Sequence, residues 1–284
     1  MMIRFGRRTL PGFLVAALLS SGCATASKRT SSPAPASAQA PAPTATSAPS
    51  TPSAPTVATS TPARVNTALV PVPQRLEDGL PQSAVTNFVT RHERYVARAK
   101  QGDVDVLFVG DSITQGWEGS GRPVWEEYYG SMKAASFGVG WDRTQHVLWR
   151  LQNGEAQGLS PKVVVLLIGT NNLGPNTVDE TAEGMRAVVA ELRSRFKSSK
   201  ILVLGVFPRG APGSTPRQSV GAVNTIVSKL ADGQRVFYLD IGHVFVDADG
   251  VIGRDVMADL LHPTEKGYRL WAGAMKDRLT TLLR

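Results

Sequence analysis

The feature that most constrains the fold of this chain is a series of five short apolar runs separated by stretches of helical periodicity. The runs are Val104–Val109, Ala134–Phe137, Val163–Ile168, Ile201–Val206 and Val236–Leu239. Runs that are largely apolar, without regular polar alternation, are typical of parallel strands buried on both faces. Their alternation with helices predicts an α/β fold in which helices cover both faces of a parallel sheet.

Two amphipathic stretches predict the clearest helices. The first begins with a capping box formed by Thr177 and Glu180. Its apolar positions share one helical face: Val178, Ala182, Met185, Val188, Val189, Leu192 and Phe196. The second helix lies near the C-terminus and carries one apolar face: Tyr268, Trp271, Met275 and Leu279. We expect residues 70–284 to form a single globular domain.

The first 23 residues have the pattern of an export signal. Arg4, Arg7 and Arg8 precede an apolar stretch, Thr9–Leu19, that is too short to span a membrane. The residues before Cys23 are similar to a bacterial lipobox, although the leucine lies four positions before the cysteine and not three. We therefore predict residues 1–23 as a signal peptide with Cys23 as its lipidation site. The alternative is a signal peptide with an incidental cysteine.

This pattern predicts an exported protein, anchored to a membrane through the lipid on Cys23 and facing the periplasm or the cell surface. Without the lipid, the protein would be secreted. Cys23 is the only cysteine, so the chain cannot form an intramolecular disulfide.

Residues 24–67 have the composition of a tether. They are mostly Ala, Pro, Ser and Thr, and residues 31–63 contain neither a charge nor an aromatic side chain. Such a segment cannot bury enough apolar surface to offset its ordering entropy. We expect a disordered, proline-stiffened tether between the lipid and the domain.

The basic charge of the chain belongs mainly to these N-terminal segments. The formal net charge is +8, from 31 Lys and Arg and 23 Asp and Glu. Six of the basic residues and none of the acidic residues precede Val65, which leaves only +2 for the rest of the chain. The high isoelectric point is therefore no argument for nucleic-acid binding.

Four polar residues could carry chemistry at the ends of the predicted strands. Ser112 follows the first run through the turn Gly110-Asp111, Asn171 follows the third run, and Asp259 and His262 precede the final helix. Ligands of open α/β sheets bind beyond the carboxyl ends of the strands, which suits Ser112 as a nucleophile. The alternative for Ser112 is a helix cap.

Together these residues could supply what ester hydrolysis requires. Ser112 would be the nucleophile, His262 the base, Asp259 the group that orients the base, and Asn171 a donor to the oxyanion. Asp259 and His262 are three residues apart, so the carboxylate can reach the imidazole within one loop. There is no G-x-S-x-G motif, which excludes the nucleophile elbow of the α/β hydrolases.

The motifs resemble those of one hydrolase family. Gly110-Asp111-Ser112-Ile113-Thr114, Gly169-Thr170-Asn171-Asn172 and Asp259-Leu260-Leu261-His262-Pro263 are similar to three sequence blocks of the SGNH, or GDSL, hydrolases. Phe137-Gly138-Val139-Gly140, Thr144–Leu151, Phe207-Pro208-Arg209-Gly210 and Asp249-Gly250-Val251-Ile252 are most similar to the catalytic subunits of intracellular platelet-activating-factor acetylhydrolase. The resemblance extends from about Val104 to Tyr268.

The resemblance implies both a fold and a site. The fold would be a flavodoxin-like three-layer α/β/α sandwich with a five-stranded parallel sheet, and the enzyme would need neither a metal nor another cofactor. Ser112, His262 and Asp259 would form a catalytic triad. The oxyanion hole would combine the Ser112 N–H, an N–H from Gly140 or Trp141, and the Asn171 side chain.

The chain departs from the family pattern at Trp141, where the family usually has glycine. A tryptophan keeps the backbone N–H, but its Cβ restricts φ. Its indole would also crowd the acyl pocket, which suggests a small acyl group such as acetyl. Whether Gly140 or Trp141 donates to the oxyanion stays open at this point.

The remaining histidines and one acidic turn are weaker candidates. We interpret His146 as a structural residue on an apolar helix, His243 as a loop residue at the end of the fifth strand, and His92 as part of a charged helix face. Asp247–Gly250 begins like a calcium-binding loop, but the later ligands fail the required spacing, so we expect a turn.

From these observations we expect an exported serine esterase that removes small acyl groups, chiefly acetyl, from extracellular carbohydrate. The alternative enzyme is a lysophospholipase or a platelet-activating-factor-like acetylhydrolase. A hypothesis of another class is a surface carbohydrate-binding protein that has lost catalysis, against which the complete set of catalytic residue types argues. The expected partners are a small-molecule or carbohydrate ester and, through the lipid alone, a membrane. The sequence leaves the oligomeric state open.

Overall fold

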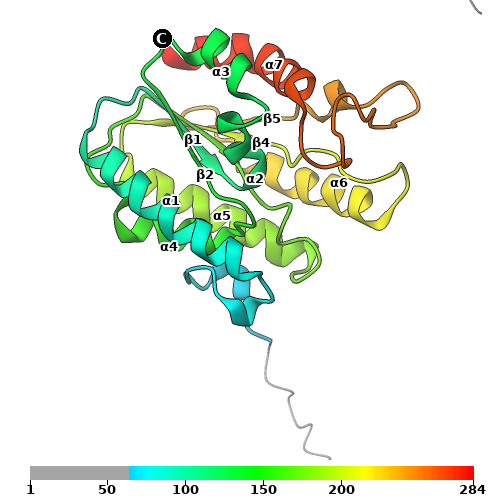
Figure 1. Ribbon diagram of the computed structural model, residues 1–284, viewed down its shortest axis with the longest axis horizontal. Helices are drawn as coiled ribbons and strands as arrows, with labels where there is room; N and C mark the ends of the chain where they lie inside the picture. Colours follow the sequence, from blue (N-terminus) through cyan, green and yellow to red (C-terminus); the bar gives the residue numbers. More distant parts are fainter. Residues whose placement is uncertain (1–63) are drawn as a thin grey trace, which may run out of the picture. The chain divides into compact units, whose positions relative to one another are not determined.

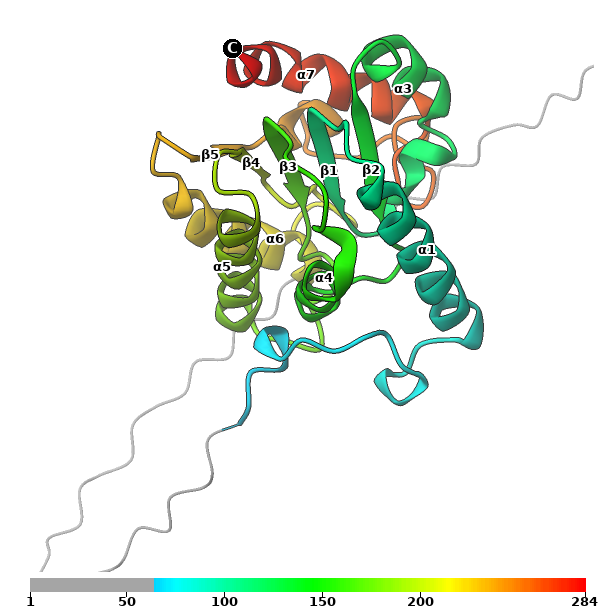
Figure 2. The same cartoon turned by 90° about the vertical axis from the view of Figure 1, so that its left-hand side faces the viewer.

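The structure is a computed structural model that describes residues 64–284, and it contains a five-stranded parallel sheet. The strands are β1 (Val106–Gly110), β2 (Ala134–Gly138), β3 (Val163–Leu167), β4 (Lys200–Leu204) and β5 (Val236–Leu239). They are ordered β2-β1-β3-β4-β5 across the sheet (Figure 2), and every pair is parallel. Figure 1 shows this sheet with helices on either side of it. Each strand coincides with one of the five predicted apolar runs to within a few residues. The predicted signal peptide, Cys23 and nearly all of the tether lie outside the described residues.

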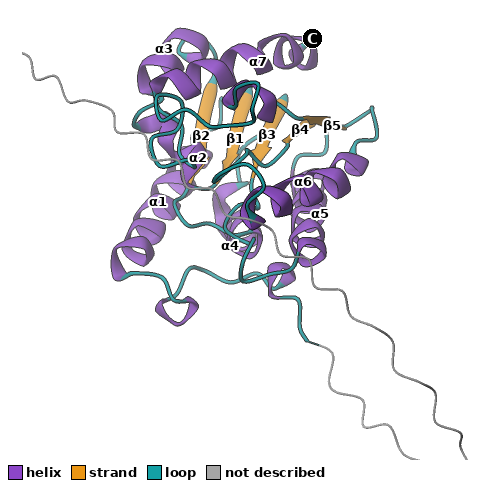
Figure 3. Cartoon of the chain, turned by 90° about the vertical axis from the view of Figure 1, so that its right-hand side faces the viewer, coloured by secondary structure: helices purple, strands orange, loops and turns teal. Residues whose placement is uncertain are grey.

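Helices cover both faces of the sheet, as predicted. They are α1 (Gln82–Lys100), α2 (Ser112–Gln115), α3 (Arg122–Tyr129), α4 (Thr144–Arg150), α5 (Val178–Arg195), α6 (Thr215–Val227) and α7 (Glu265–Leu283). One face packs on α1, α4, α5 and α6, and the other packs on α3 and α7 (Figures 2 and 3). Successive β1 residues alternate between these two cores, because strand side chains point to opposite faces. The α/β/α sandwich is therefore confirmed.

Both predicted helices form with their expected apolar faces buried. Thr177 caps α5, accepting a hydrogen bond from the Glu180 N–H at 3.1 Å, while the Glu180 carboxylate accepts from the Thr177 N–H at 2.9 Å. On α7, Tyr268, Trp271 and Met275 are fully buried against the sheet. None of the helices within residues 64–284 combines the length and the apolar character that crossing a membrane requires.

Packed structure begins earlier in the sequence than predicted. Thr67–Leu69 form a 3-10 turn, and Ala68 is fully buried. The Ala68 carbonyl accepts a hydrogen bond from Thr144 Oγ1 at 2.9 Å, and Arg64 pairs with Glu180 at 2.9 Å. The boundary placed between residues 67 and 70 is therefore too late, because a proline-rich composition conceals these contacts with distant helices. We call residues 64–80 the N-terminal strap.

Two glycines allow α2 to begin directly at the sheet. A Cβ on Gly110 would lie 2.2 Å from the Leu167 carbonyl oxygen, and a Cβ on Gly138 would lie 2.1 Å from the Gln115 nitrogen. Any larger residue would push α2 away from the ends of β1 and β2. The sheet therefore presents Ser112, the first residue of α2, immediately beyond the carboxyl end of β1.

Candidate active site

Ser112 lies in a turn that is fixed by its own neighbours. Asp111 caps α2, and its Oδ1 accepts a hydrogen bond from the Ile113 N–H at 3.0 Å. Burial raises the pKa of Asp111 to about 7. As the first residue of α2, Ser112 has an N–H with no acceptor inside the helix. The turn thus presents both the hydroxyl and the N–H of Ser112 beyond the sheet.

The loop before α7 brings a histidine and a carboxylate to this serine. His262 Nε2 lies 2.9 Å from Ser112 Oγ, and His262 Nδ1 lies 2.6 Å from Asp259 Oδ2. Asp259 Oδ1 also accepts hydrogen bonds from the Leu261 N–H at 3.1 Å and the His262 N–H at 2.7 Å. Between them Leu260 has φ 63°, in the left-handed region, which bends the loop tightly. The structure thus joins all three predicted triad residues.

The charge on Asp259 suits it to orient the histidine. Partial burial alone would raise its pKa, but the hydrogen bonds from the His262 side chain and backbone outweigh burial and lower the pKa below the usual value. An ionised Asp259 accepts a hydrogen bond from Nδ1–H, so Nδ1 keeps its proton and Nε2 is free to accept the proton of Ser112. This geometry can generate a nucleophilic alkoxide during attack on an ester.

The loop Gly140–Asp142, which follows β2, contains the two candidate backbone donors, and only one of them is available. The Gly140 N–H already donates to Gln115 Oε1 at 2.7 Å. The Trp141 N–H has no hydrogen-bond partner anywhere in the described part of the chain. A Cβ built on Gly140 would lie 3.9 Å from Ser112 Cβ, so the loop adjoins the serine. Of the two alternatives, Trp141 therefore has the available donor.

Trp141 adopts the backbone conformation that a glycine would adopt more easily. Its φ is 66°, in the left-handed region, where a Cβ costs roughly 1–2 kcal/mol. The whole residue is 54% exposed, so the indole is largely in solvent. Its predicted crowding of the acyl pocket stays a prediction.

Asn171 lies beyond β3 and contacts the same loop. Its Nδ2 donates one hydrogen bond to the Asp142 carbonyl at 3.0 Å. A side-chain amide nitrogen has two protons, so a second donor remains for a substrate oxygen. The neighbouring Asn172 is fully buried and accepts a hydrogen bond from the Thr144 N–H at 3.0 Å. The first asparagine of this pair contacts the loop next to Ser112, and the second supports the fold.

A buried charge network that the sequence analysis missed lies beneath the Gly140–Asp142 loop. Arg150 Nε donates to Asp142 Oδ2 at 2.8 Å, and Arg150 Nη1 pairs with the Glu155 carboxylate. Arg150 Nη2 also donates to the Phe137 carbonyl at 3.2 Å. All three charged side chains are buried. Arginine on an otherwise apolar stretch of α4 is the signal that could have indicated this network.

The interpretation of His92 as part of a charged helix face is wrong. Its side chain is only 13% exposed, and Nδ1 lies 2.8 Å from Glu155 Oε1. The ring also packs against Trp149, with the centroids 4.8 Å apart. The partner carboxylate is 63 residues away in the sequence, so the adjacent charged residues gave no indication of it.

The other secondary candidates fit their predicted structural roles. His146 is fully buried on α4, and burial lowers its pKa to about 3, which makes it unsuitable as a base near neutral pH. His243 is exposed in the short 3-10 helix after β5. Asp247–Gly250 form a turn in which Asp247 Oδ1 accepts from the Asp249 N–H at 3.0 Å. Residues 64–284 contain no group of three or more acidic, histidine or cysteine residues that could hold a metal.

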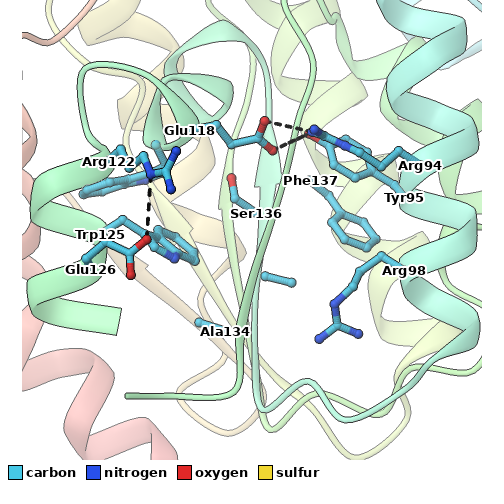
Figure 4. A pocket seen from close by; sticks show the side chains of 12 residues that line it. Arg94, Tyr95, Arg98, Glu118, Arg122, Trp125, Glu126, Ala134, Ser136 and Phe137 are labelled. Carbon is cyan, nitrogen blue, oxygen red and sulfur yellow. Dashed lines mark hydrogen bonds and ion pairs between the residues drawn. The ribbon is translucent and has the colours of Figure 1, made fainter. Parts of the chain in front are cut away.

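Two hollows adjoin the sheet ends and edge. One, of about 540 Å³, opens beside Asp259 and His262 and is also lined by Ser120, Pro123 and Thr264. The other, of about 480 Å³, lies along the edge strand β2, between Arg94 on one side and Trp125 on the other, with Glu118 bonded to Arg94 at one end (Figure 4). No triad residue lines the second hollow. The first is lined by two triad residues, Asp259 and His262.

Comparison with known proteins identifies the class to which this site belongs. The model of the GDSL-like Lipase/Acylhydrolase family matches residues 108–270. The chain therefore belongs to the GDSL, or SGNH, hydrolase family, and is a GDSL-type carboxylic ester hydrolase.

The chain is also similar to individual members of known families, one by sequence and two by structure. The platelet-activating factor acetylhydrolase IB subunit alpha2 of Rattus norvegicus is 42% identical over 200 residues, covering 69% of this chain and 85% of the relative. A GDSL-like lipase from Bacteroides thetaiotaomicron superimposes with a TM-score of 0.54 at 19% identity, over 67% of this chain and 97% of that structure. An acetylxylan esterase from Geobacillus stearothermophilus gives a TM-score of 0.51 at 18% identity, over 63% and 96%. The two solved structures share the fold.

Proposed function

We propose that the protein is a serine esterase that transfers a short acyl group from its ester to Ser112 and then to water. Ser112 is the nucleophile, and His262 is the general base and then the general acid. Asp259 orients His262 and stabilises the positive charge that His262 gains during the reaction. The Ser112 N–H, the Trp141 N–H and Asn171 Nδ2 form the oxyanion hole. The observation that carries the proposal is the continuous hydrogen-bonded path from Ser112 Oγ through His262 to Asp259.

The proposed reaction proceeds in two halves. As Ser112 Oγ attacks the ester carbonyl carbon, His262 Nε2 takes the hydroxyl proton and the carbonyl oxygen becomes an oxyanion. Collapse of this intermediate breaks the bond to the alcohol, which leaves with the proton from His262. Water then attacks the acyl-enzyme while His262 again takes a proton, and the carboxylic acid departs with Ser112 Oγ reprotonated. No step requires a metal or a redox cofactor.

For the substrate, we propose a short acyl ester of the platelet-activating-factor type, with acetyl preferred. The chain is 42% identical over 200 residues to a platelet-activating factor acetylhydrolase subunit, which supports this substrate class more strongly than it supports a carbohydrate ester. The hollow of about 540 Å³ beside His262 gives room for the alcohol part of such a substrate. Acetylated carbohydrate becomes the second candidate, because the acetylxylan esterase is similar in fold alone.

Export and anchoring through Cys23 remain part of the proposal. Their support is the pattern of residues 1–23 and the Ala, Pro, Ser and Thr composition that follows. A lipid-anchored esterase of this kind would act on esters at or near the membrane surface. Fractionation of wild type and Cys23→Ser would test the anchor, since release by the substitution supports it and a soluble, unlipidated wild type contradicts it.

The test of the proposed function is Ser112→Ala. The variant should lose turnover of an acetyl ester by a factor of at least about 10³ while keeping its melting temperature, since only one oxygen is removed. A serine-directed phosphonate should label the wild type once, at Ser112. Ser131→Ala, at an exposed position between α3 and β2 and outside the hollow beside His262, is the matched control and should retain wild-type activity. Labelling at a different serine would contradict the assignment.

An ester panel would then decide between the two substrate classes. Purified protein should hydrolyse acetylated glycerophospholipid faster than acetylated xylo-oligosaccharide at equal concentration of acetyl groups. The reverse order would favour the carbohydrate candidate. Absence of turnover on every ester, with Ser112 unreactive to phosphonate, would instead support the non-catalytic hypothesis.

A further inference from the structure

The loop Gly140–Asp142 is held in its shape by contacts from outside the loop. Trp141 has φ 66°, which disfavours any residue with a Cβ. Strained backbone of this kind persists only where the surrounding structure fixes it on several sides. Residues outside the loop must therefore hold the Trp141 backbone in this conformation.

Gln74, in the N-terminal strap, holds the peptide unit that contains this N–H. Its Nε2 donates to the Gly140 carbonyl at 2.8 Å and to Asp142 Oδ1 at 2.8 Å. The Gly140 carbonyl and the Trp141 N–H belong to the same planar trans peptide, so they point in opposite directions. Fixing the carbonyl therefore fixes the direction of the N–H, and a hydrogen bond to the carbonyl also polarises that N–H.

We infer that Gln74 is a positioning residue for ester hydrolysis: it holds the Gly140 carbonyl and the Asp142 carboxylate and so aims the Trp141 N–H at the oxyanion. This inference rests on the proposed function, in which that N–H stabilises the tetrahedral intermediate. Gln74 itself does not touch the reacting atoms.

The environment of Gln74 supports a role beyond packing. The side chain is only 3% exposed, and its Oε1 has no hydrogen-bond partner among residues 64–284. A buried amide oxygen without a partner destabilises the folded state. An apolar side chain of the same shape would avoid this cost, so the contribution of the amide lies in the two bonds that its nitrogen donates.

The N-terminal strap is bonded to two helices, α4 and α5. The Val72 N–H donates to the Gln145 carbonyl at 3.4 Å, and Asn66 Nδ2 donates to Glu183 at 2.8 Å. These contacts set the position of Gln74, although the strap precedes the family match, which begins at residue 108. The part of the chain next to the predicted tether thus belongs to the architecture of the active site.

The same loop links the two non-serine oxyanion donors. Asn171 Nδ2 bonds the Asp142 carbonyl at 3.0 Å, while Gln74 and Arg150 bond the two oxygens of the Asp142 carboxylate. Displacing the loop would therefore disturb Asn171 as well as Trp141. Consequently, substitutions at Gln74 and Asn171 should not act independently.

The experiment compares Gln74→Met with Gln82→Met in the full-length protein. Methionine keeps the length of the side chain and removes both donors. Gln82 is an exposed glutamine at the start of α1, so its substitution controls for the chemical change. For Gln74→Met, kcat on an acetyl ester should fall by about 10-fold to 100-fold and KM should stay within about twofold, because the lost interaction acts in the transition state. Gln82→Met should match the wild type in both constants.

Several outcomes would overturn the inference. Gln74→Met with wild-type kcat, or with a loss confined to KM, would show that Gln74 does not position the donor. Should Gln74→Met fail to fold, Gln74→Asn keeps the amide but is one methylene too short, and full kcat in that variant would equally overturn it. In Gln74→Met with Asn171→Ala, the combined loss should be smaller than the product of the single losses, and a full product contradicts the link. Wild-type protein without Ser112-dependent turnover would instead refute the proposed function.

Discussion

The two loops that complete the proposed active site are held in different ways. In the base loop, Asp259–His262, the hydrogen bonds that orient the imidazole run between residues at most three positions apart. In the oxyanion loop, Gly140–Asp142, the corresponding bonds come from Gln115, Asn171 and Gln74, which are 25, 29 and 66 positions away. A motif can encode the hydrogen bonds of the first arrangement, although the Gly210 N–H also donates to the Leu260 carbonyl of this loop at 3.0 Å. The second depends on the folded domain as a whole.

This difference predicts that the two loops respond differently to amino-acid substitutions. A local loop can reform whenever its own few residues are intact, whereas a loop supported from distant segments fails when any one of them shifts. Substitutions in the base loop should therefore affect chemistry alone. Substitutions that reach the oxyanion loop should affect chemistry and also depend on one another.

The largest effect should come from Asp259→Asn. Asparagine can still bond to His262 Nδ1, but it can donate there and so favour the tautomer in which Nε2 carries the proton. His262 could then no longer accept the Ser112 proton, and kcat should fall by about 10⁴. Steady-state kinetics would measure the fall in kcat, and a thermal melt would show whether the stability of the fold is unchanged. A melting temperature well below that of wild type would contradict the local character of this loop.

Sequence reasoning succeeded where the determinants are local. The five strands, the Thr177 capping box and the joining of Asp259 to His262 each follow from residues close together in the chain. It could not identify Gln74, in the N-terminal strap, or Gln115, at the end of α2, because an isolated glutamine has no pattern that reveals its burial or its partner. The same limit explains His92, which was interpreted from its neighbours while its partner, Glu155, lies 63 positions away.

Trp141→Gly should produce an intermediate effect and tests the oxyanion loop directly. Glycine keeps the N–H and tolerates φ 66° without strain, so acetyl-ester turnover should fall at most a few-fold. Removing the indole should raise the rate on butyryl and longer esters relative to acetyl. Chain-length profiles of both proteins would measure this ratio. An unchanged profile would mean that the indole lies outside the acyl pocket, which is compatible with its 54% exposure.

The smallest effect concerns stability and tests the turn that carries Ser112. Burial raises the pKa of Asp111 to about 7, well above that of an aspartate in the unfolded chain. Between about pH 4 and pH 7 the folded protein therefore binds a proton that the unfolded chain has released. The sign follows from linkage: this group stabilises the fold at low pH, and its contribution is lost as the pH rises through about 7.

Asp111→Asn should flatten this dependence while preserving the turn. The asparagine Oδ1 can still accept from the Ile113 N–H, and it has no carboxyl to titrate. Urea unfolding between pH 4 and pH 8 should give a smaller decrease in the free energy of unfolding than wild type shows. The remaining decrease includes Asp142, whose pKa burial also raises to about 7. Asp277→Asn removes an exposed carboxylate on α7 and should leave the wild-type slope unchanged. Equal slopes for Asp111→Asn and wild type would mean that Asp111 is ionised in the folded protein. Charges beyond its own turn would then have to stabilise the carboxylate. In that case the turn would depend on distant residues more than the base loop does.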